Sequence, residues 1–200
     1  KTLGFDRADG SLVVPNGSVG FRWGESGKWN IEEKDARDGR DAPLALSLAE
    51  TRDALLLVAF PYFGGIAPQD FHATNHKDVL ERNLPVRKVM TKDGEVHVAT
   101  VFDLLVGNYG IDRGFGGGNV AKSYDDDVPY TPAWAEAVTG VKREHIVAVA
   151  RQFAENADKT HGKSMVILGA GLNHWYHMDM IYRGIINLLV MCGDRKSTRL

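Results

Sequence analysis

Cysteine is almost absent from this chain of 200 residues, in which Cys192 stands alone. A single cysteine excludes a disulfide within the chain, and it excludes a zinc or iron–sulfur site built from several cysteines. Redox chemistry in such a protein would therefore need metal or cluster ligands from outside these residues. The sequence also begins without methionine and without a basic-then-apolar leader, so we expect no signal peptide and interpret the chain as a fragment.

Long apolar runs and an excess of one charge are missing as well. The apolar stretch at residues 181–192 is interrupted by Arg183 and Asn187, and it falls short of the roughly 20 residues that a membrane helix needs. The formal net charge is −2, which provides no basic surface for nucleic acid or anionic lipid. We therefore expect globular material that does not bind nucleic acid and does not itself span a membrane.

Two turn signals in the first half predict β-hairpins. The pairs Asn16-Gly17 and Asp93-Gly94 are typical of tight turns between antiparallel strands. The predicted hairpins join residues 12–14 to residues 19–23, and residues 87–90 to residues 96–101.

Glycine and aspartate runs at residues 114–118 and 125–127 suggest a phosphate cradle followed by a carboxylate metal cluster. However, no Gly-Lys-Ser/Thr follows the glycines, no strand clearly leads into them, and adjacent carboxylates repel one another. We therefore interpret both runs as loops. A charged segment and a glycine-proline segment, at residues 32–41 and 61–68, are likewise predicted to be surface loops.

The second half changes to helical spacing. Thr131 is predicted to cap a short helix that begins at Pro132 and ends at Gly140. Apolar spacing then predicts an amphipathic helix, a short strand and a helix buried nearly all round, over residues 144–157, 165–168 and 178–191. This order predicts an α/β fold, with residues 1–125 as a hairpin-rich insertion or subdomain and residues 126–193 as an α/β segment that is incomplete as a domain.

A loop suited to a ligand lies between the predicted strand and the buried helix. Gly169-Ala170-Gly171 is expected to let the backbone turn sharply at the carboxyl end of the strand, where open α/β sheets bind ligands. Asn173, His174 and His177 follow, but the two histidines lack a third zinc ligand nearby, and the glycine spacing departs from the dinucleotide fingerprint. The loop instead suits a large polar-aromatic ligand that carries a phosphate group.

A polar stripe runs along the last helix, where Asp179, Arg183 and Asn187 recur every four residues. Arg183 has two interpretations of equal weight: an ion pair with Asp179, or a contact to the ligand of the loop. No Ser-His-Asp, Cys-His or paired-carboxylate arrangement can be assembled. The remaining histidines are interpreted as surface or structural residues: His72, His76, His97, His145 and His161.

Three segments resemble a known family. They are residues 15–35 (PNGSVGFRWGESGKWNIEEKD), residues 130–141 (YTPAWAEAVTGV) and residues 157–193, which include the sequence Asn-His-Trp-Tyr-His. These segments are similar to the large (alpha) subunit of membrane-bound respiratory nitrate reductase, which belongs to the molybdenum oxidoreductases with a bis(molybdopterin guanine dinucleotide) cofactor. The resemblance extends over about residues 1–193.

The resemblance implies an internal fragment of a catalytic subunit that reduces nitrate to nitrite by oxygen-atom transfer. It implies part of a layered α/β molybdopterin oxidoreductase domain, whose molybdenum ligand and 4Fe-4S ligands lie upstream, so that no residue here is catalytic or binds metal. Implied partners are nitrate, an iron–sulfur beta subunit and a haem-containing membrane gamma subunit, at the cytoplasmic face of the cell membrane. The residues implied in cofactor binding are Gly169, Gly171, Asn173, His174, His177 and Arg183.

Two alternatives remain open at this point. One is the related nitrite oxidoreductase, which runs the reverse reaction, and the other is a free-standing α/β module that binds a nucleotide without catalysis. The resemblance ends at Gly193. Residues 194–200 match the translation of a sequencing-library adapter, and we predict that they form a non-native tail.

Overall fold

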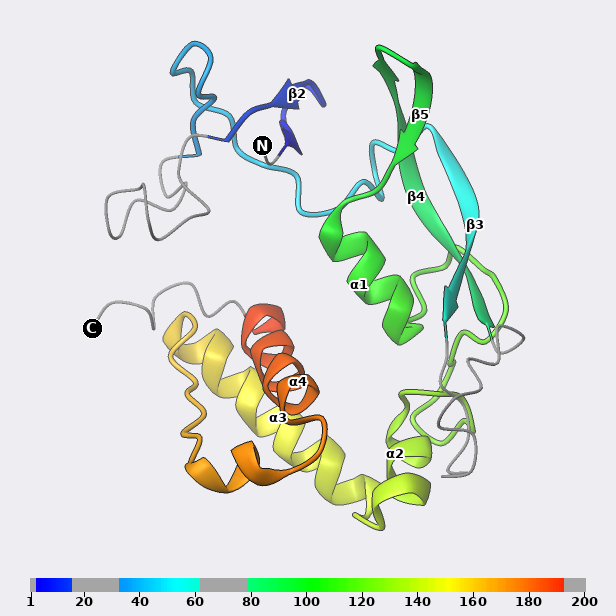
Figure 1. The fold of residues 1–200 in the computed structure, drawn as a ribbon, viewed down its shortest axis with the longest axis vertical. Helices are drawn as coiled ribbons and strands as arrows, with labels where there is room; N and C mark the ends of the chain where they lie inside the picture. The colour runs from blue at the N-terminus through cyan, green and yellow to red at the C-terminus, as the bar shows by residue number, and fades with distance from the viewer. Residues whose placement is uncertain (1–2, 16–32, 62–78, 193–200) are drawn as a thin grey trace. The chain divides into compact units, whose positions relative to one another are not determined.

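The computed structural model describes residues 3–15, 33–61 and 79–192 (Figure 1). These residues form two small antiparallel sheets and four α-helices, which confirms the predicted mixed α/β class. The chain divides into two compact units, unit 1 (Lys1–Val138) and unit 2 (Thr139–Leu200). The predicted division at residue 125 concerns domains of the longer protein and stays a prediction. The predicted tail, the segment 19–23, His72 and His76 lie outside the described residues.

The first sheet pairs β1 (Gly4–Phe5) with β2 (Leu12–Val13) in antiparallel register, Gly4 opposite Val13. Gly10 closes the turn between them, because its positive φ of 70° lets its amide donate to the Asp6 carbonyl at 2.9 Å. Residues 12–13 therefore pair with the segment that precedes them. The predicted partner of this strand lies outside the described residues.

The second sheet has the order β3 (Ala54–Pro61), β4 (Val79–Thr91), β5 (Gly94–Val98), all antiparallel. Thr91 pairs with Gly94, so the tight turn at Lys92-Asp93 confirms the predicted second hairpin. The predicted extension of its second strand to residue 101 is wrong. The chain enters α1 (Val101–Tyr109) instead, because Thr100 caps the helix by accepting from the Asp103 amide at 3.0 Å.

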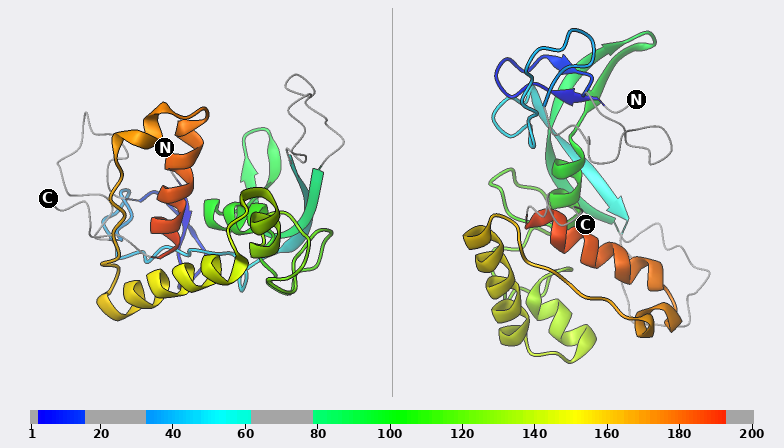
Figure 2. Two further views of the ribbon diagram at one scale, coloured as in Figure 1. Left: turned by 90° about the horizontal axis from the view of Figure 1, so that it is seen from below. Right: turned by 90° about the vertical axis from the view of Figure 1, so that its left-hand side faces the viewer.

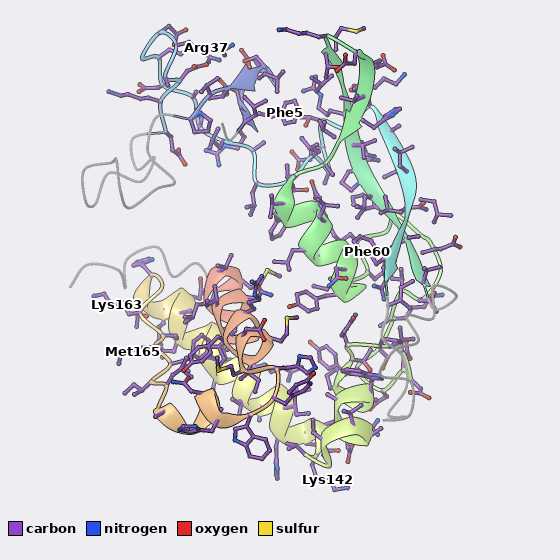
Figure 3. All side chains as sticks on the ribbon, in the orientation of Figure 1. Phe5, Arg37, Phe60, Lys142, Lys163 and Met165 are labelled. Carbon is purple, nitrogen blue, oxygen red and sulfur yellow. The ribbon has the colours of Figure 1, made fainter. Side chains whose placement is uncertain are left out.

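Helix α1 packs against β4, and the core of unit 1 forms there (Figures 1 and 2). Phe60, Leu80 and Leu84 are its buried cluster, with Phe60 labelled in Figure 3. Gly107 of α1 allows the close approach: a Cβ at this position would lie 2.3 Å from Leu84 Cδ2 and 3.3 Å from Phe60 Cζ. A larger residue at Gly107 would clash with the buried Leu84 side chain, so that either this side chain or the helix would have to shift.

Two helices follow as the sequence predicts. Helix α2 (Pro132–Thr139) is capped by Thr131, whose Oγ1 accepts from the Trp134 amide at 3.1 Å. Helix α3 (Arg143–Thr160) extends the predicted helix by one residue at its start and three at its end, and it is capped by His161, which has a left-handed φ of 57°. His97, His145 and His161 are exposed, as expected.

The predicted strand at residues 165–168 is wrong. Residues 163–169 are an irregular segment between α3 and the short 3-10 helix η2 (Ala170–His174), and Figure 3 labels Lys163 and Met165 on it. Met165 and Ile167 are 72% and 84% exposed. A strand persists only where a neighbour accepts its backbone hydrogen bonds, and none of the described strands pairs with this segment.

Helix α4 (Met178–Met191) has the predicted bounds but not the predicted burial. None of its residues is buried, and Ile186 and Val190 are more than half exposed. Apolar composition predicts burial only where other elements cover the helix, and the described residues do not cover this one. In the part of the chain that the structure describes, no helix has the length and apolar character required to cross a membrane.

Candidate functional site

The six predicted site residues lie in one short part of unit 2. Gly169 precedes η2, Gly171, Asn173 and His174 belong to it, and His177 directly precedes α4. Arg183 lies in the second turn of α4, and all six residues are exposed. The structure therefore presents them on one loop and the helix that follows it.

The loop is held to α4 by a few specific contacts. The Tyr182 hydroxyl donates to Oδ1 of Asn173, which ties η2 to the helix. His177 has a left-handed φ of 59°, and its carbonyl accepts from the amides of Met180 at 3.0 Å and Ile181 at 3.3 Å. His177 thus starts α4 with its backbone, while its ring packs edge-on against Tyr176 at a centroid distance of 4.1 Å.

The two glycines do not make the sharp turn predicted for them. Gly169 has φ −110° and ψ 170°, and Gly171 is not among the residues with positive φ, so other residues could adopt both conformations. A Cβ at either position would meet no described atom within 4 Å. The prediction that these two positions need glycine for its backbone conformation is therefore wrong. The missing side chain would matter only where another group approaches the backbone closely.

One interpretation of Arg183 is not realised. The described residues include both Asp179 and Arg183, and no ion pair joins them. The guanidinium is exposed on the helix and keeps its donors for another group. Its contact to a ligand stays a prediction.

The chemistry of the loop is that of a hydrogen-bond donor set. An amide, two imidazoles and a guanidinium can donate to phosphate oxygens or to ring nitrogens, and Arg183 adds a positive charge. Trp175 and Tyr176, each 70% exposed, offer ring faces beside these donors. Such a set can bind and orient an anionic aromatic group.

Three carboxylates of unit 1 are buried among the described residues and were not predicted as such: Asp6, Asp35 and Asp103. Asp103 accepts from Ser47 Oγ at 2.6 Å and Arg113 Nη1 at 2.7 Å. Asp35 is fully buried, which corrects the prediction that residues 32–41 are only a surface loop. Spacing at Thr100 and Asp103 was a detectable capping signal. Asp35 accepts from Arg37, only two residues further on, but its burial depends on segments that the fold brings together.

The glycine run at residues 114–118 is a loop, as predicted, and it packs on β4. Gly117 has a φ of 111°, and a Cβ there would lie 2.9 Å from the Arg82 Cα. The glycines thus let this loop approach the strand backbone. In the described part of the chain, no group of three or more His, Cys, Asp or Glu residues has the geometry to hold a metal ion, residues 125–127 included.

Comparison with known proteins defines the class to which the chain belongs. It is 53% identical over 194 residues to respiratory nitrate reductase 1 alpha chain of Escherichia coli (strain K12), and 55% identical over 194 residues to the respiratory nitrate reductase 2 alpha chain of the same strain. It is 41% identical over 193 residues to the nitrate reductase alpha chain of Bacillus subtilis (strain 168). No family model matches.

These relatives are all alpha chains of nitrate reductases, and the chain belongs to their family. Within the family, its identity to the two respiratory alpha chains is higher than to the Bacillus subtilis protein. Each of the three matches covers 96% of the chain, which spans only 15% or 16% of the length of these relatives. The alignment therefore compares one segment of a longer protein.

Proposed function

We propose that the protein to which this segment belongs is the catalytic subunit of a molybdenum-dependent nitrate reductase. It would reduce nitrate to nitrite by oxygen-atom transfer, in which two electrons and two protons convert the oxygen atom removed from nitrate into water. The observation that carries the proposal is the identity of 53% and 55% to two respiratory nitrate reductase alpha chains over 96% of the chain. Identity of this extent over nearly all of a sequence favours a shared reaction over a shared fold alone.

Within that enzyme, this segment helps to bind a bis(molybdopterin guanine dinucleotide) cofactor. When bound, this group supplies the redox and oxygen-transfer chemistry, and the protein supplies binding and orientation. The donor set fits the group: Arg183 matches a phosphate, and Asn173, His174 and His177 can donate to phosphate or to ring nitrogens. Gly169 and Gly171 carry no side chain that would keep the cofactor from the backbone.

The remaining parts of the enzyme lie beyond these residues. The molybdenum ligand and the ligands of a 4Fe-4S cluster are expected upstream. An iron–sulfur beta subunit and a haem-containing membrane gamma subunit are the proposed partners, with the complex at the cytoplasmic face of the membrane. When bound, the iron–sulfur clusters would supply electrons to the molybdenum centre, and this segment would contribute cofactor binding and no catalytic residue.

The test uses the full-length enzyme with its partner subunits. We expect Asn173→Ala, His174→Ala and Arg183→Met each to lower the molybdenum content per subunit or to shift the molybdenum reduction potential, because each removes a donor from the cofactor. His145→Ala is the matched control, since His145 is an exposed histidine on α3.

Unchanged molybdenum content and potential in all three variants would contradict the assignment of the loop. The reaction is tested separately, by nitrite formation from nitrate with an artificial electron donor in the unmodified enzyme. Absence of nitrite from an enzyme with full molybdenum content would contradict nitrate reduction and leave the cofactor assignment standing.

A further inference from the structure

A small cavity in unit 1 lies where β4, the end of α1 and the glycine-containing loop meet. Its volume is about 20 Å³, which is room for one ion or one water molecule. The residues that line it come from β4 (Arg82, Asn83, Leu84), from α1 (Gly107) and from residues 111–120 (Ile111, Asp112, Arg113, Phe115, Gly116, Val120). None of the six residues proposed to bind the cofactor belongs to this lining.

Arg82 is the unusual member of this lining, because its charged side chain is almost completely buried. The residue is 2% exposed, and its guanidinium donates only to backbone carbonyls. Nη1 donates to the carbonyls of Gly107 at 3.1 Å and Asn108 at 2.6 Å, and Nη2 donates to that of Asn119 at 3.0 Å. Nε is buried and has no hydrogen-bond partner among the described residues.

The positive charge of Arg82 is only partly balanced by these contacts. Gly107 and Asn108 lie in the last turn of α1, and a helix C-terminus is equivalent to about half a negative charge. These carbonyls place partial negative charges at the guanidinium but no full negative charge. No described carboxylate forms an ion pair with Arg82, and burial lowers its pKa.

The other charged groups of the lining do not supply the missing charge. Arg113 is matched by Asp103, whose Oδ1 lies 2.7 Å from its Nη1. Asp112 is exposed, and its carboxylate accepts from the Gly114 amide at 2.8 Å. Buried charges in proteins are normally paired, and a buried cation with an unused donor beside a cavity calls for a negative partner.

We propose that this cavity binds one small monovalent anion of halide size, which the Arg82 guanidinium holds. The volume of about 20 Å³ is sufficient for one body of the size of a water molecule, which a single monoatomic ion matches more closely than sulfate or phosphate does. The anion stabilises the junction at which residues 111–120 pack on β4 and on the end of α1. This role is separate from the cofactor loop and from nitrate reduction.

The decisive experiment is anomalous diffraction from crystals of the full-length enzyme soaked in sodium bromide. We expect an anomalous peak within hydrogen-bond distance of the Arg82 guanidinium. A water molecule or a protein group at that place, with no bromide peak, would overturn the proposal.

Hydrogen exchange of the full-length enzyme tests binding in solution. Exchange of residues 111–120 is expected to be slower in sodium chloride than in sodium gluconate at equal ionic strength. Val120→Phe fills the cavity without removing a charge, and it should abolish both this difference and the bromide peak. Val101→Phe, at a position 82% exposed on α1, is the matched control and should keep both. A chloride effect that survives Val120→Phe would contradict the site.

Discussion

The Asp35 carboxylate is buried although its segment, residues 32–41, is rich in charged side chains. Its carboxylate accepts from Nε and Nη2 of Arg37 at 3.0 Å and 2.5 Å, and also from the Arg37 amide. The hydrogen bonds from the Arg37 side chain are the largest cause that lowers the pKa of Asp35 to about 2, against the opposing effect of burial. The aspartate therefore stays charged in the folded protein at neutral pH.

This pKa makes stability depend on pH in a defined window. An unfolded aspartate has a pKa of about 3.9, so the folded state favours the charged form of Asp35. Its contribution to the free energy of unfolding is complete above about pH 4 and is lost as the pH falls towards about 2. Asp35→Asn should lower the free energy of unfolding at pH 7 and flatten its decrease in this window, as measured by urea unfolding at several pH values.

The matched control for Asp35→Asn is Asp41→Asn, which changes an exposed aspartate of the same segment. We expect this control to keep the pH dependence of the unmodified protein. If the Asp35→Asn protein showed the same slope against pH as the control, the Arg37 contact would not be responsible for the dependence.

At the scale of elements, local signals predicted local structure. The caps at Thr131 and Gly140, the apolar period of α3 and α4 and the turn before Gly94 act over a few residues, and the corresponding elements form. The strand at residues 165–168 and the burial of α4 depend on neighbours from elsewhere in the protein, which no local pattern contains. Those predictions failed for that reason.

The candidate site, likewise, could be predicted from the sequence only in part. Because its residues are close in sequence, their shared place on one loop and one helix could be predicted. Their geometry could not, since the contact of Asn173 with Tyr182 and the missing ion pair of Arg183 depend on side-chain packing. The cavity at Arg82 could not be predicted from the sequence, because its lining comes from a strand, a helix and a loop that only the fold brings together.

The junction of α1 with the following loop provides a test of this packing. Gly110 has a φ of 68°, and a Cβ there would lie 2.6 Å from Arg82 Nη2 and 2.7 Å from its Cζ. Gly110→Ala therefore combines backbone strain, about 1–2 kcal/mol for the left-handed region, with a clash against a buried guanidinium. We expect the total loss, measured by urea unfolding, to exceed the strain alone.

The variant Gly39→Ala separates the backbone strain from the clash with Arg82. Gly39 has a similar φ of 76°, and a Cβ there would meet nothing within 4 Å, so this variant should lose only about 1–2 kcal/mol. Equal losses in the two variants would mean that Arg82 moves aside without cost, and that it is not held by its three carbonyls.

At the scale of the whole molecule, polar contacts of Asp103 join parts of unit 1 that are far apart in sequence. Asp103 accepts hydrogen bonds from Ser47 and from the Leu48 amide, 56 and 55 residues away in sequence. Burial alone would raise the pKa of Asp103, but hydrogen bonds from Ser47, the Leu48 amide, Arg113 and Thr100 outweigh it, and the pKa is lowered. These partners lie in residues 47–48, 100 and 113, so one charged group joins three segments of unit 1.

Asp103→Ala should therefore weaken unit 1 as a whole and leave unit 2 unaffected. Removing one partner of a buried ion pair costs about 3–5 kcal/mol, because the remaining groups lose their acceptor. We expect hydrogen exchange, followed by mass spectrometry, to become faster in β4 and α1 and to stay unchanged in α3, since Ser47, Leu48, Thr100 and Arg113, which hold Asp103, all belong to unit 1. Asp127→Ala, an exposed aspartate in unit 1, should change neither unit. Faster exchange in α3 of the Asp103→Ala protein would show that the two units are energetically coupled, which the contacts of Asp103 do not predict.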